Sequence, residues 1–410
     1  MIDIKNKSLN SLFEFSILLF YVWYFLPIVN VHLQGTLFKL VFFAFLAIGI
    51  VGFLVCNNLK LNSITTVVLL YYIIFTFLVL LDVDDAARTV RVNFIFFAMS
   101  LIYFGLLPDK SKTSICKKIM ILFAITAITS AIGVLIDPNA ARTISHAAAD
   151  DILQATYKVN NIAGIYMFQS LVYFVPLLVC LPRRRKQKIL PIILLILIFV
   201  VLLNASFTIS LLLFLFALIT SIVFNNKGKK RVIALICTTI VLAALFINGK
   251  AILSSLSATI DNELVSSRIV ELRDMIYSGV STGDAGLRLE LYTASLRTFI
   301  QNPFGIGAFY SYQTMENGIG YHSQLLDDLA RYGIFSLAFY IAFFVSYYKM
   351  LKREYEKINA KQIAGIIIAI YIAFLTLNIG FRSAEESVCM FAILPFIPTL
   401  INEFKDKKKV

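Results

Sequence analysis

Apolar runs about as long as a membrane-crossing helix recur along nearly the whole of this 410-residue chain. A helix needs roughly 20 apolar residues to cross the hydrocarbon core of a bilayer. Hydrophobic residues make up 59% of the sequence, charged residues make up 15%, and the mean hydropathy is +0.84. A soluble domain of this composition would have a largely apolar surface. We therefore predict an all-α polytopic membrane protein.

The distribution of basic residues along the chain predicts about twelve transmembrane helices, with both termini in the cytoplasm. In this threading 20 lysines and 5 arginines lie inside, against 3 lysines and 9 arginines outside. Cytoplasmic loops of membrane proteins are enriched in Lys and Arg, which also accounts for the net charge of +13 without nucleic-acid binding. The predicted spans are residues 11–28, 36–55, 64–82, 91–107, 119–136, 160–181, 189–204, 207–224, 231–248, 324–348, 362–380 and 387–402.

The threading divides the chain into three parts. Residues 1–248 carry transmembrane helices one to nine, and residues 324–410 carry helices ten to twelve and a basic cytoplasmic tail. Between them, residues 249–323 form a large extracytoplasmic loop, and loops of this size are usually functional. Apolar spacing within the loop predicts short amphipathic helices over 261–277 and 285–301, with Asp284 as a cap for the second.

Arginine outside the membrane needs an explanation other than orientation. The planar guanidinium binds phosphate or carboxylate with two parallel hydrogen bonds, which lysine does less well. The outer arginines therefore favour an anionic, phosphate-bearing substrate on the outer face. The alternative is that they pair with nearby carboxylates such as Glu271, Asp274 and Glu290, or with lipid headgroups.

A set of short motifs resembles the O-antigen ligase and polymerase (Wzy-type) superfamily. Their order and placement, more than any single one, carry the resemblance. The chain departs from the family in one turn: it has Ser206, but Phe207 stands where the family often has an arginine. The motifs are Arg142, Asn160-Asn161-Ile162-Ala163, Arg288 to Tyr292, Asn302-Pro303-Phe304-Gly305-Ile306-Gly307, His322-Ser323 and Gly333-Ile334.

The resemblance implies a GT-C-like membrane glycosyltransferase that moves glycan from a polyprenyl-diphosphate carrier to an acceptor hydroxyl. The leaving diphosphate gains charge in the transition state, so fixed cationic donors would stabilise it by about 3 kcal/mol each. Arg142, Arg268 and Arg288 are the candidates, and we favour Arg288 over Arg297 because nine helical residues place these two on opposite faces. The alternative for Arg268 and Arg273 is a salt bridge.

His322 is the candidate for the acceptor side of the reaction. A neutral histidine can accept or orient the proton of a hydroxyl, and acidic residues including Asp328 follow it on the next predicted helix. The alternative is a capping role at the interface. Asn161, Tyr292 and Asp328 are further candidates for binding substrate. Outer aromatic residues could stack on sugars or simply pack the loop; these are Tyr292, Phe309, Tyr310 and Tyr312.

One acidic cluster, Asp82, Asp84 and Asp85, has the ligand type that a divalent metal prefers. We favour a solvated helix end paired with Arg88 and Arg91, and therefore predict neither a metal nor a cofactor.

Three functions remain open. The first is a polysaccharide polymerase in a bacterial plasma membrane, facing outward and acting on a polyprenyl-diphosphate-linked oligosaccharide, with a chain-length regulator and a flippase as candidate partners. The second is a ligase that moves finished glycan to a different acceptor, which residue patterns do not separate from a polymerase. The third is a twelve-span transporter or flippase; it is disfavoured because the two halves of the chain are unlike.

Overall fold

The computed structural model describes most of the chain, and every secondary-structure element within the described residues is helical. This confirms that the fold is all-α, whereas the count of twelve spans, the cytoplasmic termini and the large extracytoplasmic loop stay predictions. The described residues are 2–33, 35, 40, 44, 47, 63–80, 95–102, 109–145, 151–181, 189–205, 208–226, 228–259, 263–278, 283–307, 318–378 and 384–406.

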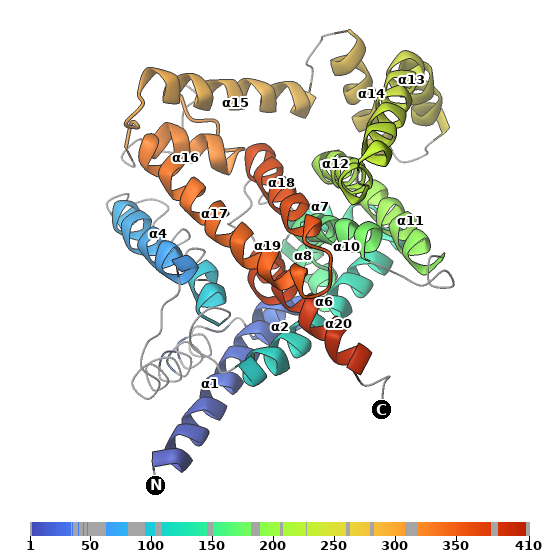
Figure 1. The fold of residues 1–410 in the computed structure, drawn as a ribbon. Helices are drawn as coiled ribbons and strands as arrows, with labels where there is room; N and C mark the ends of the chain where they lie inside the picture. Colours follow the sequence, from blue (N-terminus) through green and yellow to red (C-terminus); the bar gives the residue numbers. More distant parts are fainter. Residues whose placement is uncertain are drawn as a thin grey trace.

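The helices pack into a bundle, and α15 lies across one end of it (Figure 1). Figure 1 shows α15 along one edge of the molecule, over α16 and α18, whereas α1 and α20 end at the opposite edge. The elements are α1 (Ile2–Phe25), α2 (Pro27–His32), α4 (Ser63–Leu80), α6 (Asp109–Ile136), α7 (Ala140–Ser145), α8 (Asp151–Val159), α9 (Ile165–Ser170), η2 (Leu171–Phe174), α10 (Val175–Cys180), α11 (Ile189–Asn204), α12 (Thr208–Asn225), α13 (Lys229–Thr259), α14 (Glu263–Tyr277), α15 (Gly283–Gln301), α16 (Gln324–Tyr332), α17 (Ile334–Glu356), α18 (Gln362–Leu377), α19 (Ala384–Val388), η5 (Cys389–Ile393), η6 (Leu394–Phe396) and α20 (Ile397–Asp406).

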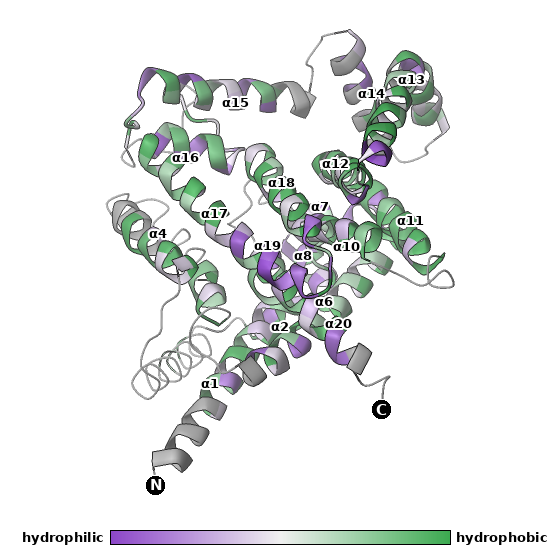
Figure 2. Cartoon of the chain, viewed as in Figure 1, coloured by the Kyte–Doolittle hydropathy of each residue, from purple (hydrophilic) through white to green (hydrophobic). Residues whose placement is uncertain are grey.

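Apolar side chains on the long helices face outward, as expected for helices in lipid. On α6 they recur every three or four residues, at Ile121, Ile125, Ile128, Ile132 and Leu135. Figure 2 shows α11 and α12 apolar along most of their length, whereas α15 alternates between polar and apolar residues. Within the described ranges four helices are long and apolar enough to cross a membrane: Lys112–Ile136, Thr208–Asn225, Ile334–Glu356 and Glu385–Glu403. The chain is therefore a multi-pass membrane protein.

Aromatic side chains fill the centre of the bundle. The rings of Tyr173 and Tyr371 stack with their centroids 4.2 Å apart, and both residues are buried. Phe343 lies nearly parallel to Tyr347, whose hydroxyl donates to the Met390 carbonyl oxygen over 2.6 Å. A buried tyrosine hydroxyl needs such a partner. These contacts join η2, α17, α18 and η5 into one core.

The predicted span over residues 324–348 is not one helix, and this prediction needs correction. Gly333 separates α16 from α17 with a φ of +60°. A Cβ on Gly333 would lie 2.2 Å from the carbonyl oxygen of Pro303, so only glycine fits this bend. The polar α16 thereby turns away from the direction of α17 and packs against α15.

The two helices predicted over residues 261–277 and 285–301 are present as α14 and α15, whereas their location in an outer loop stays a prediction. α13 continues beyond the predicted end of span nine at residue 248, as far as Thr259, and α14 packs back along it. The hydroxyl of Ser266 donates to the Ser257 carbonyl oxygen over 2.8 Å. Asp284 lies in the first turn of α15, after Gly283, and not at the cap position that the sequence suggests.

Candidate functional site

A buried hydrogen-bond network joins α15 to the start of α16. The fully buried Ser295 donates to Asp327 Oδ1 over 2.7 Å and accepts from the Gly320 N–H over 2.8 Å. Asp327 Oδ2 accepts from the Ser323 N–H over 3.2 Å, and the Ser323 hydroxyl caps α16 by accepting from the Leu326 N–H over 3.1 Å. This reciprocal arrangement is similar to a capping box. It fixes segment 320–323, including His322.

The turn over residues 302–307 anchors α15 to the junction of α16 and α17. The Ile334 N–H donates to the Pro303 carbonyl oxygen over 2.8 Å, and the Gly307 N–H donates to that of Arg331 over 2.9 Å. The Asn-Pro-x-Gly-x-Gly motif and the Gly-Ile motif, separate in sequence, therefore bind each other. Both motifs have a structural role here, because they hold the site helices together.

We expect Gly305→Ala to disrupt this anchor. Gly305 has a φ of +85°, and a Cβ would lie 2.2 Å from the carbonyl oxygen of Arg331. Backbone strain alone costs roughly 1–3 kcal/mol, and the clash adds to it. Thermal unfolding of the purified protein should show a clearly lower Tm. Gly228→Ala is the matched control, because Gly228 also has positive φ (+52°) but no atom within 4 Å of its Cβ position. Equal effects of the two substitutions would contradict the anchor.

Arg288 and Tyr292 lie one turn apart on the same face of α15. The Tyr292 hydroxyl donates to the Leu377 carbonyl oxygen at the end of α18 over 2.7 Å. Burial raises the pKa of Tyr292, and the neighbouring Arg288 guanidinium partly opposes this rise through its charge and hydrogen bonding. Arg288 is half-buried, whereas Arg297 is exposed on the same continuous helix. The contrast between the two arginines agrees with the predicted opposite faces.

The half-buried His322 has one ring nitrogen engaged with the backbone. Its Nδ1 lies 3.0 Å from the carbonyl oxygen of Gly320. A carbonyl oxygen can only accept, so Nδ1 carries the hydrogen, and in the neutral ring Nε2 keeps its lone pair. The preceding residue, Tyr321, has a φ of +58° and its ring lies 5.2 Å from the Arg331 guanidinium. Strained backbone of this kind is concentrated at functional sites.

The two aspartates of α16 face different neighbours. Asp327 belongs to the network with Ser295, whereas Asp328 Oδ2 accepts from the Tyr340 hydroxyl of α17 over 2.5 Å. The Asp328 carbonyl oxygen also accepts from the Ser336 hydroxyl over 3.0 Å. Asp328 thus contributes to the joint between α16 and α17. The sequence pattern singled out Asp328, but Asp327 and Ser295 are the polar pair that supports the His322 segment.

Asn161 terminates α8 in a Schellman motif. Its N–H donates to the Lys158 carbonyl oxygen, and the next N–H donates to that of Tyr157. The motif requires a left-handed residue, and Asn161 has a φ of +56°. Its side-chain Nδ2 donates to the Thr129 hydroxyl of α6 over 3.1 Å, but the buried Oδ1 has no hydrogen-bond partner in the described part of the chain.

Arg142 lies on the short helix α7, which packs against α8, and is half-buried. The hydroxyl of Ser145, one turn further along α7, accepts from the Ile165 N–H over 2.9 Å. A Cβ on Gly164 would lie 2.4 Å from the same hydroxyl oxygen, so glycine allows α7 to approach the start of α9 closely. Arg142 and Asn161 therefore belong to one local unit.

Buried amides connect this unit to the His322 segment. Gln169 on α9 accepts, through Oε1, a hydrogen bond from Asn378 Nδ2 over 3.3 Å, and the Asn378 carbonyl oxygen accepts from the Gln324 N–H over 3.0 Å. Glu386, which is 1% exposed, lies close by on α19, where Tyr371 donates to its carbonyl oxygen over 3.3 Å. Sequence reasoning missed these residues. The available signal was polar side chains within or beside apolar runs.

The remaining predicted site residues either have a structural partner or lie outside the described part of the chain. Arg273 is paired with Asp274, 2.7 Å apart, and also donates to Ser254, as the salt-bridge alternative proposed. The backbone of Arg268 lies on α14, but its side chain lies outside the described part. The structure also does not describe several other predicted residues, namely Asp82, Asp84, Asp85, Arg88, Arg91, Phe309, Tyr310 and Tyr312. In the described ranges no group of three His, Cys, Asp or Glu side chains could hold a metal ion.

Comparison with known proteins gives one family. Residues 191–341 match the O-antigen ligase family model. This match, over less than half of the chain, supports the resemblance to the O-antigen ligase and polymerase superfamily. The matched region of this O-antigen ligase family runs from α11 into α17 and contains Arg288, Tyr292 and His322, whereas Arg142 and Asn161 precede it. No curated protein matches the sequence. A match to this family agrees with the predicted glycosyl transfer of the O-antigen ligase and polymerase type.

Proposed function

We propose that the chain is a surface-polysaccharide polymerase. It transfers glycan from a polyprenyl-diphosphate-linked oligosaccharide to an acceptor hydroxyl on another lipid-linked repeat unit, without a metal. The observation that carries the proposal is the shared placement of Arg288, Tyr292 and His322 on the α15–α16 unit, within the family-matched region. This arrangement offers a cation for the leaving group and a base for the acceptor.

On the donor side, the bond between the sugar C1 and the diphosphate oxygen breaks, and the electron pair leaves with the diphosphate. Arg288 stabilises the developing charge. A guanidinium carries five N–H donors, so contact with Tyr292 leaves donors for two phosphate oxygens. Arg142 and Arg268 are further candidates for holding the diphosphate. A half-buried position lowers the local dielectric and strengthens the interaction compared with one in water.

On the acceptor side, the hydroxyl oxygen forms the new bond to C1 and its proton passes to His322 Nε2. The bond from Nδ1 to the Gly320 carbonyl oxygen orients the ring for this step. The network of Ser295, Asp327 and Ser323 keeps the segment in place. His322 then acts as the general base, a role that contributes roughly 10²–10⁴-fold to rate.

Asn161 has the chemistry of a sugar-binding residue. Its Oδ1 has no hydrogen-bond partner in the described part of the chain, and because this atom is buried, it would accept a hydrogen bond from a sugar hydroxyl only after the neighbouring side chains move. Tyr292, next to Arg288, is a further candidate for contacting substrate. Asp328 acts through structure, because Tyr340 binds its carboxylate.

The proposed setting is a bacterial plasma membrane with the α15–α16 side facing outward. The lysine distribution supports this orientation, and the positions of α1 and α20 at the edge opposite α15 agree with it. Beyond the donor and the bilayer, a chain-length regulator and a flippase are the expected protein partners.

A ligase that moves finished glycan to a different acceptor is the second candidate, because the matching family model is that of O-antigen ligase. A polymerase and a ligase use the same donor chemistry. They differ in the acceptor molecule that binds beside His322.

The proposal is tested in proteoliposomes that contain the purified chain and a lipid-linked repeat unit. We expect polymer to form and to persist at the same rate after addition of EDTA, because arginine and not a metal balances the charge of the leaving group. Adding a separate lipid acceptor serves as the comparison. Product on that acceptor alone would favour the ligase. Loss of turnover with EDTA, restored by magnesium or manganese, would contradict the metal-independent mechanism.

A further inference from the structure

A second concave site lies at the far end of α17 and α18 from His322. The cavity has a volume of about 780 Å³ and lies between the end of α12, the start of α13, the end of α17 and the start of α18. Along α17 it is roughly 30 Å from Gly333, at 1.5 Å per residue. Its volume is in the range of small-molecule sites, and it shares no residue with the candidate transfer site.

Positive charge predominates in the lining. Arg231, Lys352 and Lys361 contribute three basic side chains, and Glu356 is the one acidic residue among the lining residues. Glu356 is 4.0 Å from Lys352, whereas Arg231 binds the Asn226 carbonyl oxygen through Nε and lies 5.4 Å from the centre of the Phe224 ring. The ring and the carbonyl hold the guanidinium in place. The cavity is therefore suited to an anion.

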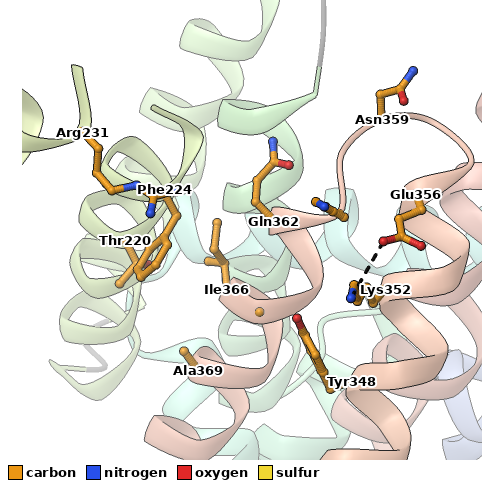
Figure 3. A pocket seen from close by; sticks show the side chains of 12 residues that line it. Thr220, Phe224, Arg231, Tyr348, Lys352, Glu356, Asn359, Gln362, Ile366 and Ala369 are labelled. Atoms are coloured by element: carbon orange, nitrogen blue, oxygen red, sulfur yellow. Dashed lines mark ion pairs between the residues drawn. The ribbon is translucent and has the colours of Figure 1, made fainter. Parts of the chain in front are cut away.

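One end of the cavity is apolar (Figure 3). In Figure 3 the side chains of Arg231, Gln362 and Glu356 lie toward one end of the cavity, and those of Tyr348 and Ala369 lie toward the other. Gly365 also lines the cavity and leaves space, because its Cβ position meets only a Tyr348 ring carbon at 3.9 Å. The site thus combines a cationic end with an apolar end.

The same helices continue the apolar surface beyond the cavity. Exposed apolar side chains occur on α12 and α17 within a few turns of it, at Leu215, Phe216, Ile222, Ile341 and Val345. A soluble anion would use only the cationic end, whereas a phospholipid would use both ends and this surface. Basic pockets between transmembrane helices are suited to anionic headgroups.

We propose that this cavity binds the phosphate headgroup of an anionic phospholipid, such as cardiolipin or phosphatidylglycerol. Arg231 and Lys361 contact the phosphate, and an acyl chain lies past Gly365 toward Tyr348. The inference does not depend on the proposed polymerase activity, because it rests on a different end of the molecule. With the outward orientation of α15, the lipid would belong to the cytoplasmic leaflet.

The test measures lipid retained by the full-length purified chain. After incubation with mixed cardiolipin and phosphatidylethanolamine, bound lipid is quantified by native mass spectrometry. We expect Arg231→Gln combined with Lys361→Gln to lower retained cardiolipin at least fivefold. We expect Gly365→Leu, which fills the apolar end without changing charge, to do the same. The matched control is Lys349→Gln combined with Arg353→Gln, which removes two charges from the same end of α17 outside the cavity.

Separate outcomes decide the proposal. Cardiolipin retained by the control but lost from both cavity variants supports it. Equal loss from the control would show general surface attraction and overturn it. Inorganic phosphate is used as a competitor at 10-fold molar excess and constant ionic strength. If phosphate displaces cardiolipin and Gly365→Leu retains as much cardiolipin as the unsubstituted chain, the cavity is a soluble-anion site and the lipid proposal is overturned. Ionic strength is kept constant because salt screens exposed charges.

Discussion

Replacement of His322 by alanine is expected to lower glycan transfer by roughly 10²-fold or more while leaving donor binding largely intact. The ring is held through Nδ1 by the Gly320 carbonyl oxygen, so the remaining nitrogen, Nε2, is the group that we propose takes the acceptor proton. In the proposed mechanism the donor diphosphate is bound elsewhere, by arginine. Polymer formation and binding of the lipid-linked donor should be measured separately on the same preparations.

His32 provides the matched control for this result. It is an exposed histidine at the end of α2, and His32→Ala should keep near-normal transfer. Near-normal polymer from His322→Ala at wild-type expression would remove the role as a base. A parallel loss of donor binding would instead point to a collapsed segment, and thermal unfolding of the variant would detect this.

Arg288→Lys should be almost as damaging as Arg288→Ala, with transfer reduced by roughly 10²-fold or more. Lysine keeps the charge but loses the fork that binds two phosphate oxygens. The position supports this role, because Arg288 is half-buried beside Tyr292, whose hydroxyl is bound to the end of α18. Rates of polymer formation at saturating donor would measure the effect on the transition state.

Arg297→Lys is the control on the same helix. Arg297 is exposed and lies nine residues further along α15, so its substitution should be mild. If Arg288→Lys keeps near-normal transfer, the diphosphate contact is wrong and a salt-bridge or structural role for Arg288 is the better explanation. If both variants lose activity equally, the loss does not depend on the position of Arg288, and the specific diphosphate contact is contradicted, because both lysines keep the positive charge.

Sequence patterns were most informative where local rules apply. Apolar spacing predicted the helices α14 and α15. The end of α15 at Gln301 was predicted from Asn302-Pro303, because proline lacks the N–H that a continuing helix needs. The motifs that indicated the family also proved to be structurally coherent, since the Pro303 and Gly305 turn binds the Gly333 junction. The predicted span did not show the break at Gly333, because it joined the leucines of the otherwise polar α16 to the apolar start of α17.

The sequence by itself determined an all-helical membrane protein with a helical loop and a recognisable family pattern, because membrane insertion and helix periodicity act on neighbouring residues. Only the tertiary structure decided which polar residues meet. Asp327 and not Asp328 supports the His322 segment, Arg288 and not Arg297 lies beside a buried tyrosine, and Gln169 reaches Asn378 across 209 positions. Adjacent residues such as Asp327 and Asp328 have different partners because helix packing determines which face of each helix is buried. This packing depends on contacts between residues that are far apart in the chain.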